Sequence, residues 1–129
     1  MKTVLTGVVE KARLGDAETI QKLVNFFADR GDMLHRALSD IYENIRDFYV
    51  YREGGVVVGC GALHMLWGDL AEIKAMAVRD ERQGQGIGSR IVEACLEEAK
   101  ALGLPTVFLL TYRPGFFERF GFERVDMVT

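Results

Sequence analysis

The chain has 129 residues, of which 49% are hydrophobic and 27% charged, so it is long enough for one core and is not disordered. Its 16 basic and 19 acidic residues give a net charge of −3 without a basic block, which argues against a nucleic-acid partner. No stretch approaches the roughly 20 apolar residues of a membrane span, and we expect one soluble, cytoplasmic domain over residues 1–129, without a signal peptide or membrane partner.

The first half of the chain predicts a strand, two helices and a β-hairpin. Residues 8–13 (VVEKAR) are typical of a short strand. Asp16 is placed to cap a helix over residues 16–31, in which apolar side chains recur at helical spacing. Residues 33–45 predict a shorter helix. Two β-rich runs within residues 47–66 flank a Glu-Gly-Gly turn and predict the hairpin.

The second half continues as a strand, a helix, a strand, a helical turn and a strand. Residues 70–78 (LAEIKAMAV) predict the first of these, and an apolar stripe predicts the helix over residues 87–103. Residues 106–111 predict a buried strand, 115–120 a helical turn and 121–128 a last strand. The order β-α-α-β-β-β-α-β-α-β indicates a mixed α/β (α+β) domain.

Residues 81–90 (ERQGQGIGSR) place three glycines where a strand gives way to a helix. The first N–H groups of a helix lack intrahelical partners and lie at the positive end of its dipole, and glycine lets a large anion approach them. This pattern therefore predicts a phosphate site. A P-loop would need Gly-Lys-Ser/Thr, which is absent, and a dinucleotide fingerprint would need glycine where Ile91 stands.

The third known signature, Q/R-x-x-G-x-G/A, is matched by Gln83, Gly86 and Gly88. With its lead-in MAVRDERQGQGIGSRIVE and the order of elements, the chain resembles the GNAT (Gcn5-related) N-acetyltransferase family. The resemblance implies the GNAT acyl-CoA N-acyltransferase fold, with a mostly antiparallel sheet of about six strands flanked by about four helices. It also implies an enzyme that uses acetyl-CoA to acetylate an amine.

The same resemblance assigns cofactor contacts to the backbone. Amides of the glycine loop would hold the pyrophosphate of coenzyme A, and the preceding strand would hydrogen-bond the pantetheine arm. The amide of Val78 would also polarise the thioester carbonyl. The implied cofactor-binding residues are Met76, Ala77, Val78, Gln83, Gly84, Gln85, Gly86, Ile87, Gly88, Ser89 and Phe117.

Glu72 stands where family members often carry a general base that deprotonates the incoming amine. By strand alternation it shares a face with Lys74 and Met76, and the alternative is a solvated or salt-bridged carboxylate, with Lys74 as partner. The family's segment F-Y-x-x-x-G-F here is FFERFGF, so Phe117 replaces the tyrosine that usually protonates the leaving thiolate. Tyr112 or water could supply that proton instead.

Four segments are similar to acetyltransferases of the N-acetylglutamate synthase type, which serve arginine biosynthesis: GDMLHRALSDIYENIRDFYVY, GCGALH, LAEIKAMAV and LTYRPGFFERFGF. This similarity favours L-glutamate as acceptor. Its two carboxylates would need cations, and the candidates are Arg36, Lys74 and Arg113, each of which could also be an ordinary surface cation. His35 and His64 are possible substrate contacts or alternative bases, or structural histidines.

Several alternatives stay open at the level of the sequence. The acceptor could be another amine or a peptide amino terminus, or the chain could be a non-catalytic acyl-CoA sensor, which the loss of tyrosine at Phe117 would suit. Cys60 and Cys95 have no metal-ligand spacing, so we expect no metal site and interpret them as small buried hydrophobes. A homodimer is possible, because the family's last strand could be absent or donated by a partner.

Overall fold

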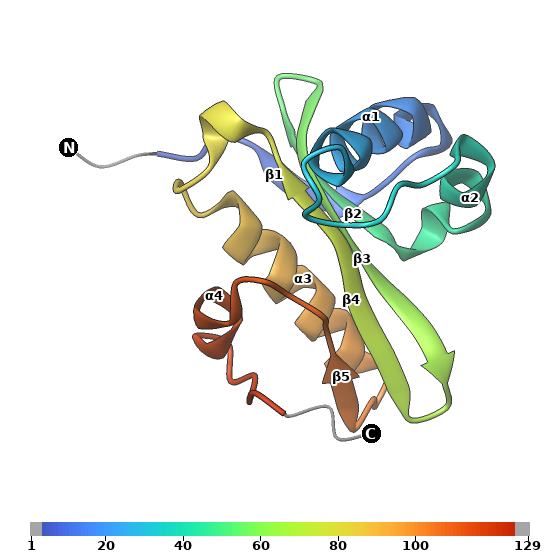
Figure 1. Ribbon diagram of the computed structural model, residues 1–129, viewed down its shortest axis with the longest axis vertical. Coiled ribbons are helices and arrows are strands. Elements are labelled where there is room, and N and C mark those ends of the chain that lie inside the picture. The colour runs from blue at the N-terminus through green and yellow to red at the C-terminus, as the bar shows by residue number, and fades with distance from the viewer. Residues whose placement is uncertain (1–3, 126–129) are drawn as a thin grey trace.

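The computed structural model describes residues 4–125, which form a five-stranded sheet with helices on both faces (Figure 1). The strands follow the order β1-β2-β3-β4-β5; the first four are antiparallel and β5 is parallel to β4. This arrangement confirms the predicted fold class. The elements are β1 (Val8–Lys11), η1 (Leu14–Asp16), α1 (Ala17–Ala28), α2 (Leu38–Glu43), η2 (Ile45–Asp47), β2 (Phe48–Glu53), β3 (Val56–Trp67), β4 (Leu70–Val78), η3 (Asp80–Arg82), α3 (Ile87–Ala101), β5 (Thr106–Phe108) and α4 (Pro114–Glu118), where η marks a short 3-10 helix.

Two helices supply most of the packing, one on each face of the sheet (Figure 1). α1 buries an apolar stripe with Ile20 and Val24 at its centre, and α3 buries one with Ile91 and Val92 at its centre. These stripes follow from residues three and four apart sharing a helix face. No helix within residues 4–125 has the length and apolar character needed to cross a membrane.

Both cysteines are buried free thiols, as predicted. Cys60 packs with the core between α1 and the sheet, and Cys95 packs on the α3 side. Burial raises the pKa of each thiol to about 12, so neither forms a thiolate nucleophile near neutral pH.

The predicted hairpin is confirmed, and its turn is made by two glycines. Gly54 and Gly55 have φ values of +57° and +81°, which are strained for other residues but allow a tight reversal between β2 and β3. Glu53 pairs with Val56 across the turn. Just before this turn, the Glu53 carboxylate pairs with Arg82 of η3 at 2.8 Å.

The predicted helix over residues 33–45 was too long. α2 begins only at Leu38, because residue 37 has an extended backbone and the residue before it is held by side chains of α1. Asp16 stands at the predicted N-cap, but its carboxylate does not cap α1. It accepts the Arg13 N–H at 2.8 Å and pairs with Arg52 at 2.7 Å, and these contacts lower the pKa of Asp16.

The predicted strands differ most near the carboxyl end. β5 covers Thr106–Phe108 rather than residues 106–111, because it pairs with only three residues of β4. Residues 121–125 are not a strand, and the remainder of the predicted last strand lies outside the described residues. The first predicted strand also ends early, at Lys11.

Candidate active site

A long open cleft of about 1690 Å³ contains nearly all of the predicted site residues. It exists because β4 and β5 pair only between Leu70–Glu72 and Thr106–Phe108, so the edge of β4 beyond Glu72 is left without a neighbouring strand. Gln85, together with the alternative candidates His35 and His64, is not part of the lining. The predicted residues that line it are Arg36, Glu72, Lys74, Met76, Ala77, Val78, Gln83, Gly84, Gly86, Ile87, Gly88, Ser89, Tyr112, Arg113 and Phe117.

The glycine loop ends at the amino terminus of α3, where backbone donors face the cleft. Gly86 is the N-cap, with φ +93°, and the first bond of the helix runs from the Arg90 N–H to the Gly86 carbonyl. The N–H groups of residues 87–89 therefore have no acceptor within the helix. Gly84 also has a positive φ, and a Cβ there would point into open space. The N–H groups at the positive end of this helix lack acceptors, and Gly84 and Gly86 have no side chains that would block access to them. Such an arrangement suits a bound diphosphate.

The edge of β4 offers a further donor to the cleft. The Arg79 N–H donates a hydrogen bond to the Val58 carbonyl at 3.0 Å, so these two residues form a bonded pair. The adjacent pair in the β3–β4 register is Val78 opposite Gly59. Antiparallel residues alternate between bonded and non-bonded pairs, so the N–H and C=O of Val78 point away from β3. The Val78 carbonyl accepts a bond of 3.0 Å from the Gln83 side chain, and its N–H faces the cleft.

A β-bulge in β4 changes which side chains share a face. Ala62 pairs with Lys74 but Cys60 pairs with Ala77, so β4 carries one extra residue, and Ala75 has φ +56°. Met76 packs against the α3 side of the sheet. The prediction that Met76 shares a face with Glu72 and Lys74 is therefore wrong. The extra residue of the bulge shifts the alternation of side chains between the two faces of the strand, so Met76 lies on the other face.

Glu72 and two cations meet at the other end of the cleft. Lys74 and Arg36 both line the cleft and also a second, small cavity that Asp40 and Asp47 help to line. Within residues 4–125, neither Glu72 nor Lys74 forms an ion pair, so the alternative of a Glu72–Lys74 salt bridge is not seen. Arg36 makes one long contact, 3.5 Å from Nη1 to Asp40, and its Nε is buried without a partner in the described part of the chain.

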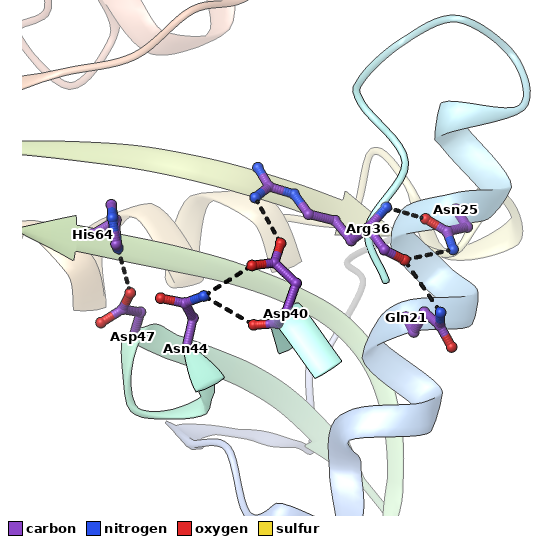
Figure 2. Close-up of polar contacts among 7 residues, drawn as sticks. All are labelled: Gln21, Asn25, Arg36, Asp40, Asn44, Asp47 and His64. Atoms are coloured by element: carbon purple, nitrogen blue, oxygen red, sulfur yellow. Dashed lines mark hydrogen bonds and ion pairs between the residues drawn. The ribbon is translucent and has the colours of Figure 1, made fainter. Parts of the chain in front are cut away.

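Side chains of α1 fix the backbone at Arg36 (Figure 2). The Asn25 carboxamide accepts the Arg36 N–H at 2.9 Å and donates to the Arg36 carbonyl at 3.1 Å, and Gln21 donates to the same carbonyl at 3.2 Å. The guanidinium leads away from this anchor toward Asp40 in Figure 2. Sequence reasoning missed Asn25 and Gln21, since a polar residue on a helix gives no sign of a distant backbone partner.

The two histidines differ in position. His64 donates to or accepts from Asp47 through Nδ1 at 2.6 Å (Figure 2), and it lies directly opposite Glu72 in the β3–β4 register. His35 pairs with Asp29 on the exposed loop after α1. Neither ring lines the cleft. Both therefore have structural partners, and only His64 is near the candidate base.

The opposite wall of the cleft carries the remaining predicted residues. Tyr112 is 83% exposed, and Arg113 forms no ion pair within residues 4–125. Arg113 shares the cleft with Arg36 and Lys74 but not their small cavity. Phe117 lies edge-on to Phe116, with ring centroids 4.9 Å apart, in an aromatic cluster along the cleft. A phenyl ring has no proton to give, so Phe117 offers packing only.

Comparison with known proteins agrees with this geometry. The model of the acetyltransferase (GNAT) family matches residues 17–122. An amino-acid acetyltransferase of Mycobacterium tuberculosis is 42% identical over 122 residues, covering 92% of this chain and 70% of the relative. The crystal structure of Rv2747 from the same organism, in complex with CoA and NLQ, has a TM-score of 0.88 and covers 95% of this chain and 76% of that one.

A second solved structure is much longer than this chain. N-acetylglutamate synthase from Neisseria gonorrhoeae, complexed with coenzyme A and N-acetyl-glutamate, is 25% identical with a TM-score of 0.89; the match covers 96% of this chain but 30% of that one. The family model spans most of the chain and the Mycobacterium relative is similar over most of its own length. This chain therefore belongs to the GNAT family and is an acetyl-CoA-dependent N-acetyltransferase.

Proposed function

We propose that this enzyme acetylates the α-amino group of a small amino acid, and that L-glutamate is the favoured acceptor. The observation that carries the proposal is the meeting of Glu72, Lys74 and Arg36 in one cleft, with the Arg36 Nε left without a partner in residues 4–125. One carboxylate is available to take a proton, and two cations are available to bind carboxylates. The similarity to an amino-acid acetyltransferase and to an N-acetylglutamate synthase supports the same acceptor.

The cations would recognise the carboxylates of the acceptor. A guanidinium can donate two parallel hydrogen bonds to a carboxylate, and Arg36 has donors to spare because Asp40 engages it at only 3.5 Å. Lys74 supplies a second, more compact charge beside it. Arg113, on the opposite wall, is the candidate for a carboxylate farther from the amine. An N-acetylglutamate product would connect the enzyme to arginine biosynthesis.

Glu72 would act as the general base. An α-amino group arrives as an ammonium ion and cannot attack until it loses a proton, which a positioned carboxylate can take directly or through water. The full reaction converts an ammonium and a thioester to an amide, a free thiol and one released proton. Glu72 lies on β4 beside the cations, so an acceptor bound by its carboxylates would present its amine near this side chain.

The backbone would hold the other substrate. Bound acetyl-CoA supplies an acetyl group activated as a thioester. Amides of residues 83–89 would bind its pyrophosphate, and the free edge of β4 at Met76 and Val78 would hydrogen-bond its pantetheine arm. By the same alternation the N–H and C=O of Ala77, opposite Cys60, point toward β3, so Ala77 lines the cleft without offering these groups to it. The Val78 N–H, directed into the cleft, would stabilise negative charge on the thioester oxygen. Phe117 would contribute apolar contact.

Tyr112 is the candidate proton donor to the leaving thiolate. It lines the cleft and has a phenolic hydroxyl, whereas Phe117 has no exchangeable proton. Water is the alternative, because a thiolate is a stable leaving group that needs little assistance. Tyr112→Phe distinguishes the two proton donors: kcat falls if the Tyr112 hydroxyl supplies the proton, and it is unchanged if water does.

A peptide amino terminus is the second candidate acceptor. The cleft is open along its length, which favours an acceptor that extends beyond an amino acid. Against this, a converging base and two cations suit a small diacid better than a main chain of varied sequence.

The deciding experiment measures release of free thiol from acetyl-CoA with each common amino acid and with short peptides, in the presence and absence of arginine. We expect turnover with glutamate to exceed that with glutamine, which has the same shape but lacks the side-chain carboxylate. Turnover confined to peptides would identify the second candidate. Binding of acetyl-CoA without turnover on any amine would contradict both and favour a sensor.

A further inference from the structure

Two ion pairs fasten the loop between β4 and α3 to the rest of the protein. Arg30, just after the end of α1, pairs with Asp80 at 2.7 Å, and the two side chains are 50% and 46% exposed. Arg82 pairs with Glu53 of β2 through two bonds of 2.8 and 3.1 Å, and both side chains are 25% exposed. Exposed single contacts are weak, whereas a bidentate, partly buried pair fixes geometry. The Glu53–Arg82 pair is therefore the firmer attachment.

The Glu53 carboxylate is itself held from behind. The Tyr51 hydroxyl donates to it at 2.8 Å, and that hydroxyl accepts the Gly7 N–H at 2.8 Å. Tyr51 is fully buried, and a Cβ at Gly7 would lie only 2.5 Å from its ring, so glycine is needed for this approach. Arg82 and Tyr51 lower the pKa of Glu53 to about 2. The carboxylate is thus charged and in place at any physiological pH.

From Arg82 the contact continues into the loop. Its Nε donates to the Gln85 side chain at 2.9 Å, next to Gly84 and Gly86, whose positive φ values let the backbone turn. In Figure 1 this yellow loop lies beside the N-terminal segment, and Leu5 approaches within 4.0 Å of where a Gly86 Cβ would be. A loop with two glycines has many alternative shapes, so its attachments decide whether its amides face one point.

We propose that Glu53 is a positioning residue for acetyl-CoA. Through Arg82 and Gln85 it holds the loop so that the amides at the start of α3 face the diphosphate before the cofactor arrives. The cofactor then binds without the cost of ordering the loop, which is how preorganisation raises affinity. This inference rests on the use of acetyl-CoA and on the proposed role of residues 83–89, and not on the identity of the acceptor.

A direct role for Arg82 predicts the opposite result. Arg82 lines the cleft, so its guanidinium could instead bind phosphate oxygens and use Glu53 only as a resting partner. Removing the Glu53 charge would then free Arg82 and leave acetyl-CoA affinity unchanged or higher. If Glu53 positions the loop, the same change lowers affinity. The sign of the effect separates the two roles.

The test is calorimetric titration of acetyl-CoA into wild type, Glu53→Gln, Arg82→Gln and the double variant. We expect the dissociation constant for acetyl-CoA to rise about fivefold to tenfold in each single variant. The double variant should show no further rise, because each single substitution already breaks the Glu53–Arg82 pair. The matched control is Glu81→Gln, which breaks the Arg79–Glu81 pair of 3.3 Å within the same loop but no attachment to the body. It should bind acetyl-CoA like wild type.

Two further readouts separate positioning from general damage. kcat at saturating acetyl-CoA should be unchanged in Glu53→Gln while the KM for acetyl-CoA rises, and amide exchange should quicken at residues 84–89 but not in β3. If Glu53→Gln does not fold, Arg82→Lys, which keeps the charge but not the bidentate fork, takes its place with the same expectation. Unchanged or tighter binding in the folded variants overturns the proposal. Wild type that does not bind acetyl-CoA would instead contradict the assignment of the cofactor loop.

Discussion

The two ends of the cleft are built from different parts of the chain. At the proposed cofactor end the groups assigned to binding are main-chain amides, at the start of α3 and on the edge of β4. At the proposed acceptor end they are side chains: Glu72 and Lys74 from β4, and Arg36 from the loop before α2. Each acceptor-end group can be removed by one substitution, whereas the amides can only be displaced by changing the backbone.

If the proposed roles hold, the enzyme could keep its cofactor while changing its acceptor. Amides bind a diphosphate whatever the neighbouring side chains are, so the proposed cofactor end should tolerate variation away from the glycines. The proposed recognition of the acceptor depends on charge at a few positions, so a change of one cation should alter specificity without disturbing acetyl-CoA. Variants that affect one end alone therefore test the comparison.

The largest effect is expected from Glu72→Gln, which removes the proposed base but keeps the shape of the side chain. We expect kcat/KM at neutral pH to fall by about 10²–10⁴, the usual contribution of a general base, with acetyl-CoA affinity unchanged. Steady-state thiol release and calorimetry measure the two quantities. Glu123→Gln, another carboxylate along the cleft, is the control and should keep wild-type turnover. A Glu72→Gln enzyme with full activity would mean that the base lies elsewhere.

Gly86→Val is expected to weaken acetyl-CoA binding by about 100-fold, because a β-branched residue cannot adopt φ +93° without strain and its methyls would crowd the anion site. Gly103→Val imposes the same kind of strain at φ +73° beyond the other end of α3. This control should lose stability to a similar extent and still bind acetyl-CoA. Equal affinities in the two variants would show that the loop at Gly86 is not the cofactor site.

A smaller effect, confined to the acceptor, is expected from Asn25→Ala. Two hydrogen bonds that hold the Arg36 backbone are lost, at about 1 kcal/mol each, so the KM for glutamate should rise by up to about 30-fold while the KM for acetyl-CoA stays constant. Gln21→Ala removes a single bond to the same carbonyl and should have a smaller effect. A rise in the KM for acetyl-CoA would show that the two ends are coupled.

The smallest effect concerns how the free energy of unfolding changes as the solution becomes acidic. The pKa of Glu53 is lowered from its ordinary 4.5 to about 2. A carboxyl whose pKa is lowered on folding stabilises the native state fully above the unfolded value, and that contribution is lost as the pH falls through the folded value. The difference in unfolding free energy between wild type and Glu53→Gln should therefore be constant above pH 4.5 and shrink toward pH 2. Urea titrations across this range measure it, and a difference that persists at pH 2 would contradict the assigned cause.

The proposed cofactor loop could be located from the sequence because its signal is local. Gln83, Gly86 and Gly88 lie within six residues, where a predicted strand gives way to a predicted helix, and the structure has both elements. The fold followed from helical periodicity and from β-rich runs, since most buried positions belong to the two amphipathic helices α1 and α3 and to the strands β2, β3 and β4. Boundaries failed where long-range contacts decide them, as at α2.

The acceptor end could be predicted only in part. Glu72, Lys74 and Arg36 were named singly, but their meeting depends on contacts that no local pattern encodes. Asn25 holds a backbone 11 residues away, and Arg82 pairs with a carboxylate 29 residues away. The bulge at Ala75 was not foreseen either, because a positive φ at alanine is uncommon and the flanking residues are typical of a regular strand.

The central claim is that acetyl-CoA is held by the backbone and the acceptor by cations, independently of each other. The most direct test is the KM for glutamate and for acetyl-CoA in wild type and in Arg36→Met, which keeps much of the apolar stem but removes the charge. A lost charged hydrogen bond is worth about 1.5–3 kcal/mol, so the KM for glutamate should rise about 10-fold to 100-fold with the KM for acetyl-CoA unchanged. An unchanged KM for glutamate, or an equal rise for both substrates, would contradict the claim.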